Sequence, residues 1–316
     1  MNKKKIKIHD PYSSSVPTLK KGEFVMDFSR KIREFESATQ ALRVKDILYQ
    51  YAFSGKGLEF DSYRDFDRTS EDSSLIDWKA SLRANKLLSK NYVEERNLNI
   101  YFLLDVSNSM LFGSGSKLKA EYAAEMIVSL SRLMISSGDK VGLIMFSDKI
   151  VKTIHPSNSK NQFAIFMRSL SDPSLYGGGF NLDRAMDSAL RTINSPYTTF
   201  ILVSDFIRTR KDLDRRFMMV GSKFETIAIM IRDKMDENLP KINCQIAVQD
   251  PYTGKQVILD PSIAEEKFKL SSLKHKGMLK DLFRRSKIDL LELSVEKSFT
   301  LPISSFLKNR TKGGRI

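Results

Sequence analysis

From residue 100 onward, short apolar runs alternate with amphipathic segments. Most of the runs are almost uninterrupted, as expected for strands of a sheet that is covered on both faces. The predicted strands are Ile100–Leu104, Val141–Phe146, Phe200–Ser204, Thr226–Ile231 and Ile288–Leu293. Apolar residues recurring every three or four positions predict helices at Lys117–Ile135, Leu182–Thr192 and Lys211–Val220. The alternation predicts an α/β fold with a doubly wound, mostly parallel sheet flanked by helices.

The residues before this region follow a different pattern. Residues 1–21 are polar and basic and contain two prolines, which predicts a flexible lead-in. Between Glu23 and Tyr51 the apolar spacing predicts one or two amphipathic helices, and residues 52–98 are expected to hold short strands and a helix. We therefore divide the chain into a lead-in (1–21), a helical and mixed N-terminal region (22–98), the α/β domain (99–310) and a flexible basic tail (311–316).

The charge of the chain is concentrated near its two ends. The 316 residues carry a net charge of +14, with nine Lys and Arg against four acidic residues in 1–34 and thirteen against four in 267–316. The central residues therefore balance, which favours solvated basic ends over a basic face within the fold. Contact of these ends with nucleic acid, an acidic membrane or an acidic partner is the alternative. The single cysteine, Cys244, and the lack of an apolar leader favour a cytoplasmic protein.

Several common catalytic and nucleotide-binding patterns are missing from the sequence. The chain has no GxGxxG, no GxxxxGK[ST] and no GxSxG motif, so dinucleotide binding, P-loop nucleotide binding and α/β-hydrolase chemistry are not supported. The three histidines, His9, His155 and His275, are far apart in sequence and have no partner at metal-ligand spacing.

One group of polar residues follows the first predicted strand directly. Asp105, Ser107 and Ser109 form a DxSxS sequence, and Asp205 follows the strand Phe200–Ser204. The carboxyl edge of a parallel sheet is where α/β folds bind ligands, so these four side chains are expected to converge there if the strands are neighbours. Their oxygens suit Mg²⁺ or another hard cation. The alternative is that the serines cap the following helix and the aspartates are solvated.

This arrangement resembles a von Willebrand factor type A domain, whose metal-ion-dependent adhesion site combines a DxSxS loop, a glycine-rich loop and an aspartate after another strand. Over residues 23–310 the chain more narrowly resembles the bacterial and archaeal domain-of-unknown-function-58 family. That resemblance also marks Trp78 and its neighbours as a structural or partner-facing surface. The matching segments are 57–60, Arg64, 76–81, 94–96, 204–206, 232–233, 239–240, 250–254 and 301–302.

The sequence departs from the family pattern at two places. Ser70-Glu71-Asp72 stands where Gly-Asp-Asp is usual, with Ser74 in place of an arginine. In the glycine-rich loop, Phe180 replaces the threonine whose hydroxyl reaches the ion, and Asn181 is a candidate substitute. We therefore expect the isolated protein to bind Mg²⁺ weakly or not at all through Asp105, Ser107, Ser109 and Asp205.

The resemblance implies a non-enzymatic protein-interaction module with a von Willebrand factor A, Rossmann-like fold. It also implies association with an AAA+ ATPase of the MoxR type in chaperone-like assembly or activation of client proteins, with no small-molecule substrate. An ion cluster without a general base or nucleophile agrees with docking better than with catalysis. Two alternatives remain, a binder of nucleic acid or membrane surfaces through the basic ends, and a metal-dependent phosphatase or nuclease.

Overall fold

The structure, a computed structural model, describes residues 24–39, 60–66, 76–92, 99–193, 198–210 and 213–313. The chain divides into two units, residues 53–97 and the remainder, each with its own internal contacts. The predicted lead-in 1–21 and the apolar positions of residues 42–48 lie outside the described residues. The candidate site lies entirely in the larger unit.

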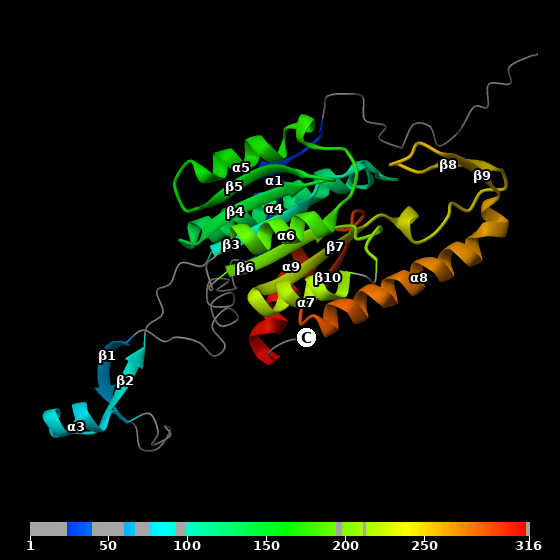
Figure 1. The fold of residues 1–316 in the computed structure, drawn as a ribbon. Helices are drawn as coiled ribbons and strands as arrows, with labels where there is room; N and C mark the ends of the chain where they lie inside the picture. The colour runs from blue at the N-terminus through cyan, green and yellow to red at the C-terminus, as the bar shows by residue number, and fades with distance from the viewer. Residues whose placement is uncertain are drawn as a thin grey trace, which may run out of the picture. The chain divides into compact units, whose positions relative to one another are not determined.

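A six-stranded sheet forms the centre of the larger unit, in the order β10-β7-β6-β3-β4-β5 (Figure 1). All neighbours pair in parallel except β4 and β5, which are antiparallel. The strands are β3 (Asn99–Asp105), β4 (Lys140–Phe146), β5 (Ile150–Ser157), β6 (Thr198–Ser204), β7 (Glu225–Arg232) and β10 (Asp289–Ser294). The five predicted strands and the mostly parallel sheet are thus confirmed. The edge strand β5 was not predicted, because it is half-exposed and lacks an apolar run.

The helices of the larger unit are α1 (Phe28–Thr39), α4 (Lys119–Ser136), α5 (Gln162–Leu170), α6 (Leu182–Thr192), α7 (Asp214–Lys223), α8 (Pro261–Arg285) and α9 (Thr300–Gly313). The predictions for α4, α6 and α7 are confirmed within a few residues. Helix α8 follows a short hairpin, β8 (Ile246–Gln249) and β9 (Gln256–Leu259), and buries few of its side chains. Its apolar positions therefore give no clear helical stripe, and the sequence did not reveal it.

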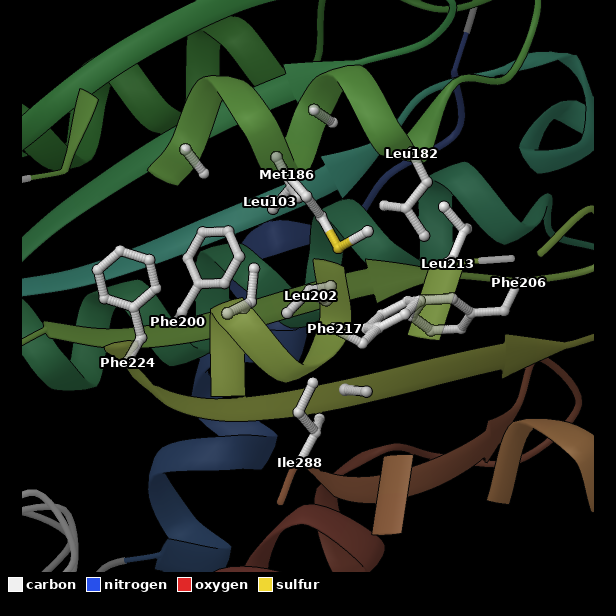
Figure 2. Close-up of a cluster of buried hydrophobic side chains, with 14 of the residues drawn as sticks. Leu103, Leu182, Met186, Phe200, Leu202, Phe206, Leu213, Phe217, Phe224 and Ile288 are labelled. Atoms are coloured by element: carbon white, nitrogen blue, oxygen red, sulfur yellow. The ribbon is translucent and has the colours of Figure 1, made fainter. Parts of the chain in front are cut away.

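Side chains alternate between the two faces of the sheet, and each face is covered by helices. On one face, Leu103 of β3 and Leu202 of β6 belong to a buried cluster with Met186 of α6 and Phe217 of α7 (Figure 2). Part of α8 joins the same cluster through Leu279, Leu282 and Phe283. This packing holds β3 and β6 side by side, and their carboxyl ends carry the predicted site.

Helix α4 packs against α1, and α1 packs against α9. Phe299 joins these helices, since its ring lies 6.1 Å from that of Phe35 and 5.6 Å from that of Tyr122. Two backbone amides before α1 add to this, because Val25 N donates to Glu121 Oε1 at 2.6 Å and Asp27 N donates to Glu125 Oε1 at 2.9 Å. The structure therefore groups α1 with the α/β unit, unlike the division at residue 98 drawn from the sequence.

The smaller unit contains β1 (Phe60–Asp65), α3 (Trp78–Ala84) and β2 (Leu88–Tyr92), with β1 antiparallel to β2. This agrees with the short strands and helix expected there. Asp77 caps α3 by accepting a hydrogen bond from Ala80 N at 3.1 Å. Trp78 and Leu82 lie one turn apart on α3 and are 61% and 82% exposed, so neither is a core residue of this unit.

The C-terminal segment is more ordered than the sequence suggested. Helix α9 extends to Gly313, so the predicted start of a flexible tail at residue 311 falls inside this helix. Many basic residues of α8 are paired with acids, including Lys276 with Glu237 and Glu292, and Arg285 with Asp214.

Candidate functional site

Asp105 is the last residue of β3 and is fully buried. Its Oδ1 accepts a hydrogen bond from Ser107 N at 2.9 Å, and its Oδ2 accepts one from Ser204 Oγ at 2.6 Å. The second bond joins the ends of β3 and β6, which are neighbouring strands of the sheet. Both oxygens of this carboxyl group therefore already have partners within the protein.

The turn after β6 is held in a strained conformation. Phe206 has a φ of 51°, in the left-handed region that costs a residue with a side chain about 1–2 kcal/mol. Its buried ring contacts Phe283 edge-to-face at 5.2 Å and belongs to the core cluster (Figure 2). Ser204 Oγ accepts from Phe206 N at 3.0 Å, and Asp205 Oδ1 accepts from Ile207 N at 3.1 Å. Core packing thus fixes the direction of Asp205.

Lys119, in the first turn of α4, is a site residue that the sequence did not reveal. Its Nζ lies 2.7 Å from Asp205 Oδ2 and 3.0 Å from Asp236 Oδ2, and its side chain is only 1% exposed. A lysine near a helix N-terminus ordinarily belongs to a solvated surface. The one available signal was weak, namely that a cation there opposes the helix dipole. Asp205 lies 86 positions after Lys119 in the chain, and Asp236 lies 117 positions after it.

The charge states follow from these contacts. Burial alone would raise the pKa of Asp205, but the Lys119 ammonium and its hydrogen bond outweigh burial and lower it. Burial acts to lower the pKa of Lys119, and the carboxylates of Asp205 and Asp236 raise it above its ordinary value. Burial, with the nearby charge of Asp205, raises the pKa of Asp105 from 3.8 to about 7. The site therefore contains a buried ammonium–carboxylate pair beside a weakly acidic carboxyl group.

The turn between β8 and β9 reaches the DxSxS loop. The hydroxyl groups of Tyr252 and Ser107 are 3.0 Å apart, and Asn108 Nδ2 donates to Pro251 O at 2.8 Å. The guanidinium of Arg208, from the turn after β6, lies 4.5 Å from the centre of the Tyr252 ring. This turn therefore covers the Ser107 hydroxyl. Residues 250–254 belong to the family pattern in the sequence, but that pattern alone does not assign them to the site.

The glycine-rich loop borders the site but offers it no side-chain oxygen. Gly178 N donates to Asn108 Oδ1 at 2.8 Å, and a φ of 95° explains why glycine stands there. The ring of Phe180 lies 6.1 Å from that of Phe146 and packs against the core cluster. Asn181 caps α6, because its Oδ1 accepts from Arg184 N at 3.0 Å. The Asn181 side chain, a candidate substitute ligand from the sequence, thus serves as a helix cap in the structure.

The four predicted ligands do come together, but the arrangement does not fit a divalent cation. Asp105 and Ser107 use their oxygens within the protein, and Ser109 Oγ lies 3.5 Å from Ser107 Oγ. Asp205 is paired with an ammonium group that would repel a second cation. Among the described residues, no group of three or more His, Cys, Asp or Glu side chains is arranged to hold a metal ion.

Comparisons with known proteins give relatives of similar length. "Uncharacterized protein Rv1480" from Mycobacterium tuberculosis and "Uncharacterized protein Mb1516" from Mycobacterium bovis are each 20% identical to the chain over 246 residues, which is 77% of either sequence. In the part of the chain that the structure describes, every helix is too short or too polar to cross a bilayer.

Among solved structures, BatB from Bacteroides thetaiotaomicron has a TM-score of 0.48 and 18% identity, covering 69% of this chain and all of that one. The VWA domain of SpRpn10 has a TM-score of 0.37 and 11% identity, covering 66% of this chain and 94% of that domain. The family model described as "Protein of unknown function DUF58" matches residues 62–276. That match spans more than half of the 316 residues and includes the DxSxS loop, α4 and the turn at Tyr252, so the chain belongs to the DUF58 family.

Proposed function

We propose that the protein is a non-enzymatic protein-interaction module that docks partners at the carboxyl edge of its sheet. One observation carries this proposal. The loops after β3 and β6, the glycine-rich loop and the β8–β9 turn are tied together by hydrogen bonds, while their acidic groups are satisfied internally. Among the side chains that this edge presents to solvent are Phe112, Ile207 and Arg208. Such a mixture of apolar groups and an arginine is typical of protein interfaces.

The side chains at this edge favour binding over catalysis. The hydroxyl groups of Ser107 and Tyr252 face one another, and His275 instead contacts the backbone oxygen of Thr209 at 3.1 Å. A serine nucleophile needs a base within hydrogen-bond reach. A metal-dependent hydrolase needs carboxylates that are available to its ion. Neither arrangement is supported by the contacts of Ser107, Asp105 or Asp205.

The partner that we propose is an AAA+ ATPase of the MoxR type, with client proteins that the pair assembles or activates. This choice rests on the family resemblance. The compartment that we propose for the protein is the cytoplasm. The alternative, binding of nucleic acid or an acidic membrane through the basic ends, is less favoured because Lys276, Lys280 and Arg285 of α8 are engaged in ion pairs.

Binding of a purified MoxR-type ATPase from the same organism tests the proposal. We expect capture of the ATPase by the wild-type protein and loss of capture by Arg208→Glu. Lys140→Glu is the matched control, because Lys140 is exposed at the opposite end of β4. Equal capture by both variants would place the interface elsewhere, and no capture by the wild type would exclude this partner. Steeply salt-dependent binding to duplex DNA or anionic vesicles would favour the alternative.

A further inference from the structure

We propose that the ammonium group of Lys119 is the resident cation of the carboxyl-edge site, in place of the divalent ion that the DxSxS pattern implies. The proposal concerns the chemistry of the site itself and is independent of the partner proposed above. It rests on three observations. These are the position of the ammonium, the contacts that hold Lys119 there, and the hydrogen bonds that already occupy the oxygens of Asp105 and Ser107.

Lys119 Nζ lies between two carboxyl groups, one of which, that of Asp205, is a predicted ion ligand. An ammonium group has three N–H donors, and here they face Asp205 Oδ2 at 2.7 Å and the two Asp236 oxygens at 3.0 and 3.2 Å. Little of this group reaches solvent, since the side chain of Lys119 is 1% exposed and that of Asp236 is 9% exposed. A lysine that is this deeply buried requires such pairing, because an uncompensated buried charge is costly.

The chain around Lys119 is folded so that the lysine and its partners hold fixed positions. Lys119 N donates to Phe112 O at 3.0 Å, which closes the loop between the DxSxS segment and α4. At Gly113 a Cβ atom would lie 2.1 Å from Lys117 O, so only glycine allows this loop. Ser114 N donates to Asp233 Oδ2 at 2.8 Å, and Asp233 N donates to Asp236 Oδ2 at 2.9 Å. One network therefore places both the lysine and Asp236.

The phenylalanine at position 180 agrees with a site that holds the Lys119 ammonium in place of a divalent ion. A threonine at position 180 would serve a divalent ion, and the phenyl ring that stands there packs instead toward Phe146 and the core. Because a second cation would be repelled by the ammonium, restoring the threonine alone is not sufficient to restore ion binding. It follows that the structure of this edge is independent of divalent ions.

Mn²⁺ is the probe for the test, because its binding to the full-length protein is followed directly by electron paramagnetic resonance. Wild type and Phe180→Thr are expected to bind no Mn²⁺ at millimolar concentration and to melt at the same temperature in Mg²⁺ and in chelator. Lys119→Ala frees two buried carboxylates and is expected to bind one Mn²⁺ and to gain thermal stability from it. Lys117→Ala is the matched control, because Lys117 is two residues away and pairs with Glu125 instead. It should bind no Mn²⁺.

Stoichiometric Mn²⁺ binding by the wild type would overturn the proposal, as would a folded Lys119→Ala variant that binds none. If Lys119→Ala does not fold, the wild type still decides the question by NMR. A buried, paired ammonium gives a slowly exchanging ¹⁵Nζ signal, which should be present in the wild type and absent from Lys119→Arg. Absence of that signal from the folded wild type would contradict the buried ion pair.

Discussion

The ammonium of Lys119 and the carboxylate of Asp205 lie 2.7 Å apart, and each side chain is only 1% exposed. The two residues come from the first turn of α4 and the end of β6, and Asp236 completes the group from the turn after β7. A pair of this kind is costly to break from one side, because the remaining charge has no water to compensate it.

We therefore predict that Lys119→Met lowers the free energy of unfolding by about 3–5 kcal/mol in urea titrations without added metal. The double variant Lys119→Met/Asp205→Asn should lose less than the two single variants together, because it removes the ammonium and one of its two carboxylate partners at once. Arg284→Ala is the control, since its pair with Asp281 is exposed and its removal should leave stability unchanged. Additive losses in the double variant would show that the two side chains are not coupled.

The raised pKa of Asp105 predicts a specific pH dependence. Burial and the charge of Asp205 raise its pKa from 3.8 to about 7 in the folded protein, so the folded state holds this proton more tightly than the unfolded state. The contribution of Asp105 to stability is therefore present below about pH 4 and is lost as the pH rises through about 7. In Asp105→Asn this loss cannot occur.

The measurement is the difference in unfolding free energy between Asp105→Asn and wild type at pH 5 and at pH 8. The substitution costs a constant amount, because an amide cannot accept both the Ser107 and Ser204 hydrogen bonds. Relative to wild type, Asp105→Asn should nevertheless be less destabilised at pH 8 than at pH 5. A difference that is the same at the two pH values would show that Asp105 is already ionised at pH 5.

Tyr252 is predicted to restrain the DxSxS loop. Its hydroxyl lies 3.0 Å from that of Ser107, and its ring lies against Arg208. Tyr252→Ala removes both contacts and should speed amide hydrogen exchange in residues 106–112 severalfold, with a smaller effect for Tyr252→Phe. Val257→Ala, on the same hairpin but 61% exposed, should leave that exchange unchanged. Unchanged exchange in Tyr252→Ala would mean that the turn rests on the site without holding it.

Helix α9 is predicted to be part of the folded unit and not a dispensable tail. Leu307 is 5% exposed, so Leu307→Ala should cost about 2–4 kcal/mol of unfolding free energy. Leu301, on the same helix, is 71% exposed, and Leu301→Ala should have no measurable effect. Similar stabilities for the two variants in chemical denaturation would contradict the packing of α9. Deletion of residues 314–316, which follow the helix, should also leave stability unchanged.

The sequence by itself determined the sheet and the approximate location of the site. Strands such as Ile100–Leu104 and Phe200–Ser204 are continuous apolar runs, because both faces of a parallel sheet are covered. Asp105 and Asp205 are then expected to lie close together if these two strands are neighbours, since both follow parallel strands at the same edge of the sheet, and the structure shows that β3 and β6 are paired. The structure places Asp105 within 2.6 Å of Ser204, the neighbour of Asp205, in agreement with that inference.

Only the tertiary structure decided what occupies and covers the site. Lys119 meets Asp205 across 86 residues, and Tyr252 meets Ser107 across 145 residues. Hydrophobic periodicity shows which side chains turn toward the core, but it carries no information about which buried charges become paired. A lysine in the first turn of a helix and a tyrosine in a hairpin turn are ordinary surface residues by sequence. Their roles depend on the three-dimensional approach of distant loops, because only there does desolvation force each polar group to find a partner.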